Sequence, residues 1–321
     1  MRAMRLHVLG ESLSLDNIPA PEPGPGQVRL KLEACGVNFG DTLTIHGKYQ
    51  EKPPLPFSPG AEVCGAVEAL GEGVTHLKLG QRVAALIGNG GFAEAALADA
   101  ASCVPVPDAM DGPTAAAFLI AYGTSHVALD YRAKLQPGER LMVLGAAGGV
   151  GLTAIEIGKL MGAEVIACAR GADRLEICKK MGADHLIDTS VEDIKVRGKA
   201  LGGVDVVYDP VGGDQFRAAL SACRPEARMI PLGFASGDIP QIPANLLLVK
   251  NIDVIGLYWG AYRKFKPKVI TDSIATLFQW FVDGKLHPHV SHILPLEQSG
   301  AAIALLAERK ATGKVVVDCT A

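Results

Sequence analysis

The stretch Leu141-Met-Val-Leu-Gly-Ala-Ala-Gly-Gly-Val-Gly151 decides the fold of this chain. Residues 141–144 are a short apolar run of the kind that forms a buried strand. Residues 148–161 then have the length and apolar spacing of a helix, and residues 164–168 are a second apolar run. Together they make one βαβ unit, which predicts a parallel sheet.

The same alternation continues toward the C-terminus. A helix is predicted to open at Asp173, with Glu176 three residues further on, as in a capping box. Helical segments then separate several further apolar runs. These runs are residues 186–187, 204–208, 229–232 and 254–258. The pattern predicts an α/β domain with a doubly wound parallel sheet.

Toward the N-terminus the pattern changes to short strands. Residues 28–34 alternate apolar and charged side chains strictly, which is typical of a half-buried strand. Residues 61–70 and 82–86 are further short strands, separated by glycine-rich turns. The first hundred or so residues therefore predict a β-rich domain.

The C-terminal segment does not extend the parallel sheet, because polar, lysine-rich sequence follows its last strand. Amphipathic helices are predicted around residues 274–282 and 298–308, with a final strand over 314–318. We expect this segment to rejoin the β-rich domain. The expected domains are residues 1–120 with 262–321, and an inserted domain at residues 121–261.

The glycine-rich turn after residue 144 is a place where a dinucleotide pyrophosphate can bind. It lies between a strand and a helix, so backbone N–H groups at the helix N-terminus face an anion. Gly148 would let the phosphates approach, and Gly151 would let the helix pack on its strand. Ala146 replaces the first glycine of GxGxxG, so the strand-to-helix setting carries the prediction. A glycine-rich turn without a ligand is the alternative.

The end of the second strand indicates which dinucleotide is bound. A free ribose 2′-hydroxyl would call for an acidic side chain there, but the sequence is Ala169-Arg-Gly-Ala-Asp-Arg174. Asp173 is explained as a helix cap. Arg170 and Arg174 favour a 2′-phosphate and hence NADPH, because guanidinium groups bind phosphate in a bidentate manner. The alternative is that both are solvated surface charges.

Composition excludes several classes of protein. The 321 residues are 49% hydrophobic and 20% charged, enough for two cores. The net charge of -3 leaves no cationic surplus for nucleic acid. No signal-peptide core and no apolar run of about 18 residues is present, so no membrane span is expected. The seven cysteines contain no CxxC pair, and we expect them to be buried thiols in a cytoplasmic protein.

Seven segments along the chain form a recognisable series. They are Ala34-Cys-Gly-Val-Asn-Phe-Gly-Asp41, Gly47-Lys-Tyr49, Pro56-Phe-Ser-Pro-Gly-Ala-Glu62, Gly145-Ala-Ala-Gly-Gly-Val-Gly151, Gly182-Ala-Asp-His185, Tyr208-Asp-Pro-Val-Gly-Gly213 and Gly313-Lys-Val315. In these segments the chain resembles the zinc-independent NADPH:quinone oxidoreductases (zeta-crystallin-like) of the medium-chain dehydrogenase/reductase superfamily. The resemblance implies a GroES-like catalytic domain, built from both ends of the chain, around an inserted Rossmann domain, with the active site in the cleft between them.

The resemblance also implies site residues. Asn38 and Asp41 would face the nicotinamide ribose, and Tyr49 would hydrogen-bond the developing oxyanion or give a proton, a role that solvent could also fill. Packing of Tyr49 against Pro53 or Pro54 is the alternative. The cofactor-binding residues would be Asn38, Thr124, Gly148, Gly149, Val150, Ala169, Arg170, Arg174, Gly233, Phe234 and Lys314.

No metal site is expected. Zinc-dependent relatives have Cys where this chain has Asn38 and His where it has Ala61, next to the Glu retained as Glu62. Neither an amide nor a methyl group replaces those zinc ligands. Residues 287–292 contain three histidines, but their spacing matches no common zinc site, and we expect a solvated loop.

The expected reaction is zinc-independent hydride transfer from NADPH to a small electrophile, either a quinone or an activated enone. Reduction of a 2-enoyl thioester such as an acyl-CoA is an alternative, for which Lys264, Lys266 and Lys268 could bind phosphates. A third hypothesis is that the protein binds NADPH but catalyses little turnover. The apolar edge strand at residues 252–258 predicts a homodimer.

Overall fold

The computed structural model describes residues 1–321 and divides into two compact units. One unit comprises Met1–Ile120 and Pro288–Ala321, and the other comprises Ala121–His287. The sequence pattern predicts the second boundary before residue 262. It lies later because helix α10 (Pro267–Val282) packs on the helical segment η2 (Val127–Arg132) of the second unit.

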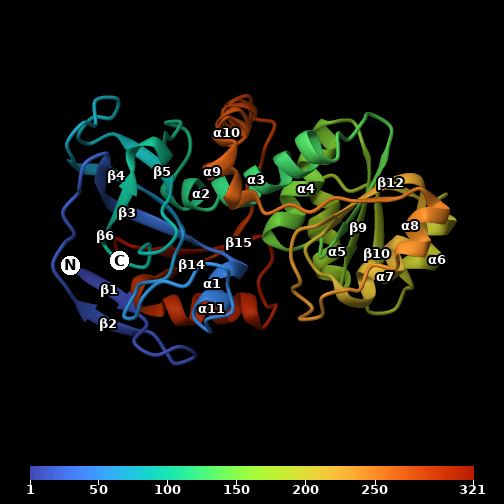
Figure 1. Cartoon of the computed structure of the whole chain (residues 1–321), viewed down its shortest axis with the longest axis horizontal. Helices are drawn as coiled ribbons and strands as arrows, with labels where there is room; N and C mark the ends of the chain where they lie inside the picture. Colours follow the sequence, from blue (N-terminus) through green and yellow to red (C-terminus); the bar gives the residue numbers. More distant parts are fainter. The chain divides into compact units, whose positions relative to one another are not determined.

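The unit Ala121–His287 is built on a six-stranded parallel sheet, shown with its flanking helices in Figure 1. The strand order β10-β9-β8-β11-β12-β13 is that of a doubly wound Rossmann sheet, so the predicted α/β fold is confirmed. The strands are β8 (Arg140–Leu144), β9 (Glu164–Ala169), β10 (His185–Asp188), β11 (Val204–Asp209), β12 (Cys223–Pro231) and β13 (Asp253–Val254).

Helices cover this sheet through buried apolar side chains. Helix α4 packs on β8 and β9, and α7 packs on β11 and β12. The helices are α3 (Leu119–His126), α4 (Gly149–Leu160), α5 (Ala172–Lys180), α6 (Ile194–Ala200), α7 (Gly213–Ala222), α8 (Ala244–Lys250), η3 (Trp259–Ala261), α9 (Tyr262–Phe265), η2 and α10.

Two expectations about this unit are wrong in detail. Helix α5 is capped by Gly171, not by Asp173, which lies in its first turn. The edge strand expected over residues 252–258 is only the two-residue β13. Ile255 still donates its N–H to Met229 O, but the chain then leaves the sheet at Gly256 on its way to the buried Trp259.

The unit that contains both chain ends is β-rich, as expected of a GroES-like domain. Its seven-stranded sheet has the path β14-β15-β3-β4-β5-β7, with β6 also paired to β3. In Figure 1, β3 and β15 come from opposite ends of the colour scale, and they pair antiparallel. The C-terminal segment therefore rejoins the N-terminal domain, as predicted.

The elements of this unit follow the sequence patterns closely where strands are long. They are β1 (Arg2–Arg5), β2 (Ser14–Asn17), β3 (Gln27–Val37), α1 (Phe39–Thr44), β4 (Glu62–Leu70), β5 (Arg82–Leu86), β6 (Ala95–Asp99), η1 (Ala100–Ser102), β7 (Cys103–Pro105), α2 (Gly112–Ala116), β14 (Val290–Pro295), η4 (Leu296–Gln298), α11 (Ser299–Ala307) and β15 (Lys314–Asp318).

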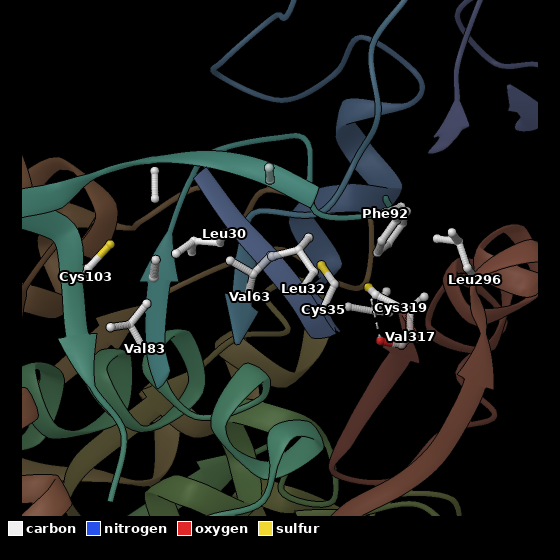
Figure 2. Close-up of a cluster of buried hydrophobic side chains, with 14 of the residues drawn as sticks. Leu30, Leu32, Cys35, Val63, Val83, Phe92, Cys103, Leu296, Val317 and Cys319 are labelled. Atoms are coloured by element: carbon white, nitrogen blue, oxygen red, sulfur yellow. Dashed lines mark hydrogen bonds between the residues drawn. The ribbon is translucent and has the colours of Figure 1, made fainter. Parts of the chain in front are cut away.

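The core of this unit lies between the strands and α11. Figure 2 shows its side chains, among them Leu30, Leu32 and Val63 from the central strands. Cys35 and Cys319 are part of this apolar cluster, and burial raises the pKa of both thiols. All seven cysteines are free and buried, which confirms that they pack as small apolar residues.

The prediction of a solvated loop for the histidine-containing segment is only partly right, since residues 287–289 lie outside any helix or strand and His287 is exposed. Residues 290–292 begin strand β14, which pairs in parallel with β15. Its side chains are half-buried or exposed, so the strand is set by backbone pairing to a partner that a local pattern does not reveal. No group of three or more His, Cys, Asp or Glu side chains is placed to hold a metal ion. None of the helices has the length and hydropathy needed to cross a membrane.

Candidate functional site

The turn between β8 and α4 leaves backbone N–H groups available to an anion. Gly145 turns the chain with a φ of 57°, and Gly148 is the extended N-cap of α4. No side chain caps this helix. The first N–H groups of a helix have no partner within it, and the helix dipole favours negative charge at this end. Gly149 and Val150 therefore lie where the sequence analysis expected the pyrophosphate.

The packing of this turn explains its glycines. A Cβ at Gly151 would lie 2.5 Å from Gly145 O and 2.6 Å from Ala146 O, so only glycine fits there. A Cβ at Gly148 would come within 4 Å only of Gly145 O, at 3.3 Å. Gly151 thus allows the helix to approach its strand, and Gly148 leaves room above the turn for a ligand.

The end of β9 presents cationic side chains. Ala169 is buried, Arg170 directly after it is exposed, and Arg174 is half-buried in the first turn of α5. Asp173 is exposed and does not cap α5, so the prediction that it serves as the cap of this helix is wrong. Arg170 and Arg174 nevertheless closely follow the strand end where a 2′-phosphate was expected.

A carboxylate that sequence reasoning missed lies beside this strand end. Asp188 ends β10 and stands in register with Ala169. Its Oδ1 accepts hydrogen bonds from the Gly171 N–H at 3.0 Å and from Ser190 Oγ at 2.5 Å. The Gly171 N–H, followed by the two Ser190 groups, holds the pKa of Asp188 below its ordinary value. Only the pairing of β9 with β10 brings it here.

The ends of β11 and β12 complete this edge of the sheet. Asp209 is buried, and its Oδ1 accepts the N–H groups of Val211 at 2.7 Å and Gly212 at 2.8 Å. Burial raises its pKa despite these bonds. Gly233 and the partly exposed Phe234 follow β12. Because the order reverses between β8 and β11, the carboxyl ends of these strands lie where such sheets usually bind dinucleotides.

Helix α3 is fixed beside the first turn of α4. Ser125 Oγ donates to Val150 O at 3.1 Å and lies 2.8 Å from both Thr153 Oγ1 and Tyr208 Oη. The preceding residue, Thr124, is half-buried. Its expected contact with the cofactor stays a prediction.

In the other unit, Asn38 and Asp41 form the start of α1. The Asn38 N–H donates to Asp41 Oδ2 at 2.7 Å, and the Gly60 N–H donates to Asp41 Oδ1 at 3.3 Å. Burial outweighs these two bonds and raises the pKa of Asp41 to about 6. The carboxyl group therefore fixes the loop and changes its charge near pH 6.

Strand pairing brings Lys314 and Glu62 to Asn38. Lys314 begins β15 and Glu62 begins β4, and both strands flank β3, which ends at Val37. The Lys314 ammonium donates to Asn38 Oδ1 at 2.6 Å and to Glu62 Oε2 at 3.2 Å. The sequence analysis did not count Glu62 among the site residues, because nothing local shows that it meets Lys314.

Tyr49 is half-buried in the loop after α1. A Cβ placed on Gly40 would lie 3.4 Å from two atoms of the Tyr49 ring, so the ring packs against this helix. Its role toward an oxyanion stays a prediction.

Both units match known family models. Residues 24–108 match the alcohol dehydrogenase GroES-like domain, and residues 149–274 match the model described as zinc-binding dehydrogenase. The quinone oxidoreductase-like protein 2 homolog of Nematostella vectensis is 40% identical over 99% of this chain and 88% of that protein.

Solved structures match over nearly the whole length. Quinone oxidoreductase of Thermus thermophilus, solved alone and with NADPH, has a TM-score of 0.88 and 32% identity over 99% of this chain and 100% of that chain. The Escherichia coli quinone oxidoreductase complexed with NADPH has a TM-score of 0.93 and 27% identity, with the same coverage. The chain therefore belongs to the quinone oxidoreductase family of the medium-chain dehydrogenase/reductase superfamily.

Proposed function

We propose that this protein is an NADPH-dependent reductase that transfers hydride to a quinone or to the β-carbon of an activated enone. The observation that carries the proposal is the uncapped N-terminus of α4 at the same sheet edge as the exposed Arg170. This edge offers N–H groups to a pyrophosphate and a guanidinium to a 2′-phosphate. Two similar structures were solved with NADPH, which supports the same cofactor here.

The protein's own residues would bind and orient. When bound, the cofactor supplies the hydride from its nicotinamide ring. Gly148, Gly149 and Val150 would hold the pyrophosphate, and Arg170 with Arg174 would hold the 2′-phosphate. Ala169, Thr124, Gly233 and Phe234 would line the cofactor. These positions restrict motion and exclude water, which accounts for much of the catalysis in such reactions.

The loop of the other unit would act on the nicotinamide half and the substrate. Asn38 and Asp41 would lie at the nicotinamide ribose, with Lys314 behind them. Tyr49, or solvent, would give a hydrogen bond or a proton to the oxygen that gains charge when the acceptor is reduced.

We further propose that the reaction needs no zinc. Asn38 and Ala61 cannot serve as zinc ligands, and the Asn38 oxygen already accepts the Lys314 ammonium at 2.6 Å. Glu62 is likewise paired with that ammonium. A cation of the protein itself thus compensates the carboxylate at this place.

Reduction of a 2-enoyl thioester is less well supported by the side chains that would have to bind it. Lys266 donates to Tyr131 Oη at 2.7 Å, and Lys268 pairs with Asp272 at 2.8 Å. The ammonium groups of Lys266 and Lys268 are therefore already bonded to side chains of the protein itself. Lys264 forms no ion pair.

Acceptor specificity separates these alternatives. We expect NADPH oxidation with 1,4-benzoquinone or 9,10-phenanthrenequinone, measured by loss of absorbance. Turnover confined to a crotonyl thioester would replace the quinone assignment with thioester reduction. A rise in melting temperature with NADPH, without turnover of any acceptor in a broad panel, would identify a binding protein.

Arg170→Ala tests the cofactor assignment. Loss of a charge-assisted bond to the 2′-phosphate should raise the KM for NADPH by about 10- to 100-fold and leave the KM for NADH nearly unchanged. Arg197→Ala, which removes an exposed arginine on α6 of the same unit, is the control. An equal effect of Arg170→Ala on both cofactors would contradict recognition of the phosphate.

We also propose an oligomeric state and a cellular location for this protein. The sheet path ends at β13, whose outer edge is unpaired, so we propose a homodimer through the edge around residues 252–258. We place the protein in the cytoplasm, since all seven of its cysteines are free thiols, as is usual in a reducing compartment.

A further inference from the structure

Three donors converge on the Glu62 carboxylate, which is fully buried. Its Oε1 accepts the Ile120 N–H at 2.8 Å. Its Oε2 accepts Asn38 Nδ2 at 3.1 Å and Lys314 Nζ at 3.2 Å. A glutamine here would turn its own NH₂ group toward one of these donors, whichever way the amide was oriented. Both terminal atoms of the side chain at this position must therefore accept hydrogen bonds, as the two oxygens of a carboxylate do.

The Lys314 ammonium is matched in the opposite sense. Lys314 is 7% exposed, and its three protons have three acceptors: Val37 O at 3.1 Å, Asn38 Oδ1 at 2.6 Å and Glu62 Oε2 at 3.2 Å. No proton of this group is left over for a ligand.

These two side chains fix which way the Asn38 amide faces. Its oxygen faces the Lys314 donor, and its Nδ2 faces the acceptors Glu62 Oε2 and Gly36 O, at 3.1 and 3.3 Å. The reverse orientation would place NH₂ against ammonium and oxygen against carboxylate. Both protons of Nδ2 are used, so any further bonding capacity of this half-buried side chain lies at Oδ1.

We propose that Glu62 and Lys314 are positioning residues that make Asn38 a hydrogen-bond acceptor for a ligand hydroxyl. Burying two charges costs free energy that an apolar pair would not, so the pair is better explained by the orientation that it imposes than by stability. The ligand hydroxyl in question is a ribose hydroxyl of the cofactor, and that part rests on the proposed function.

The first test uses the protein without ligand. Hydrogen exchange of the Asn38 Nδ2 protons, followed by NMR, should be about tenfold or more slower than that of Asn17, which is exposed. Exchange of Asn38 as fast as that of Asn17 would overturn the proposal. This measurement needs no variant, so it remains decisive if the substituted proteins fail to fold.

The second test uses Lys314→Met and Glu62→Gln. Glu62→Gln should speed exchange of the Asn38 protons toward the rate of Asn17, because it removes the carboxylate that accepts one of them, whereas Lys314→Met should leave this exchange slow, because Lys314 bonds to the amide oxygen. Each variant should raise the KM for NADPH about tenfold, with little change in kcat, because a ribose contact is made equally before and during hydride transfer. Glu33→Gln is the control, since it disrupts the half-exposed Arg82 pair in the same unit without touching Asn38.

The two readouts separate the inference from the proposed function. Release of the Asn38 protons with an unchanged KM for NADPH would overturn the link between Asn38 and the ligand hydroxyl. Absence of any NADPH binding by the unsubstituted protein would overturn the proposed function, and slow exchange of Asn38, lost in the Glu62→Gln variant, would still support the positioning role of Glu62.

Discussion

Gly151 shows how a single missing Cβ determines the geometry of the β8–α4 turn. Alanine at this position would place its Cβ 2.5 Å from Gly145 O and 2.6 Å from Ala146 O, and backbone atoms yield little. We expect Gly151→Ala to lower the free energy of unfolding by roughly 1–3 kcal/mol and to weaken NADPH binding, both measured by urea titration with and without cofactor.

Gly300→Ala is the matched control for this prediction. Gly300 also lies in the first turn of a helix, α11, but a Cβ there meets nothing within 4 Å. Alanine should stabilise this site by a few tenths to about 1 kcal/mol. Equal effects of the two substitutions would show that close packing does not require Gly151.

Asp41 makes a contribution to stability whose pH dependence has an unusual sign. Burial raises the pKa of Asp41 to about 6, so the folded state binds this proton more tightly than the unfolded chain does. The cost of the buried charge is therefore present above pH 6 and is relieved as the pH falls from 6 toward 4. An ordinary carboxyl group with a lowered pKa would behave in the opposite way.

Asp41→Asn isolates this contribution. The difference in unfolding free energy between the unsubstituted protein and the variant should shift toward the unsubstituted protein by up to about 1.4 kcal/mol per pH unit between pH 6 and 4. It should stay constant above pH 7. Other buried carboxyl groups, such as Asp209, cancel in this comparison. A difference that does not vary with pH would contradict the raised pKa.

At the residue scale, side chains with a distinctive chemistry of their own could be predicted from the sequence. Side chains whose role depends on a partner far away in the sequence could not. Arg170 was evident because it replaces an expected acidic residue. Glu62 and Asp188 were not, since their contacts are with Lys314 across the sheet and with Gly171, which caps α5 just after the neighbouring strand β9. Side chains that position others leave no local signal in one sequence.

At the scale of elements, α3 and α4 are joined by a buried polar contact. The Tyr122 hydroxyl donates to Glu156 Oε2 at 2.5 Å, and Glu156 Oε1 accepts the His287 N–H at 2.7 Å. Glu156 is almost fully buried. Tyr122→Phe would leave one oxygen of this carboxyl group without its donor, so we expect a loss of about 1–2 kcal/mol in unfolding free energy.

Tyr131→Phe provides the comparison for this prediction. The Tyr131 hydroxyl also forms a side-chain hydrogen bond, with Lys266, but this tyrosine is exposed. Its loss should change the unfolding free energy by less than about 0.5 kcal/mol in the same denaturant titration. If Tyr122→Phe had an effect as small as this, the buried contact would not hold α3 to α4.

The elements that could be predicted were those with a periodic pattern of their own. The final strand β15 has the expected bounds, Lys314–Asp318, and α4 differs from its expected range by one residue at each end. Strand β14 was missed because its half-exposed residues pair by backbone alone, and β13 was overestimated because apolar composition does not show where a chain leaves a sheet.

At the scale of the whole molecule, the order of strands explains why both chain ends are needed for one unit. Strand β15 lies between β14 and β3 in the sheet, so residues more than 270 positions apart in sequence meet at Lys314 and Val37. The alternation of patterns predicted this return of the chain, but the boundary at His287 follows from where α10 packs.

The same scale governs assembly, because β13 leaves the parallel sheet with an open edge. The nearby helix α8 has no buried residue, and its Leu248 and Val249 are 78% and 70% exposed. An unpaired edge with apolar neighbours favours pairing with a second copy. We therefore expect a dimer in sedimentation velocity at micromolar concentration.

Leu257→Lys tests whether this edge is the interface. Leu257 is half-buried and lies three residues beyond β13, just after the chain leaves the sheet, within the segment 252–258 proposed as the interface, so a lysine there would place an unpaired charge between two copies. The variant should sediment as a monomer with an unchanged circular dichroism spectrum. Val191→Lys adds the same charge at an apolar side chain that is 82% exposed and lies beyond β10, at the opposite end of the sheet path, so it should remain dimeric. A monomeric parent protein would contradict the proposed dimer, and a Leu257→Lys variant that stays dimeric would place the interface elsewhere.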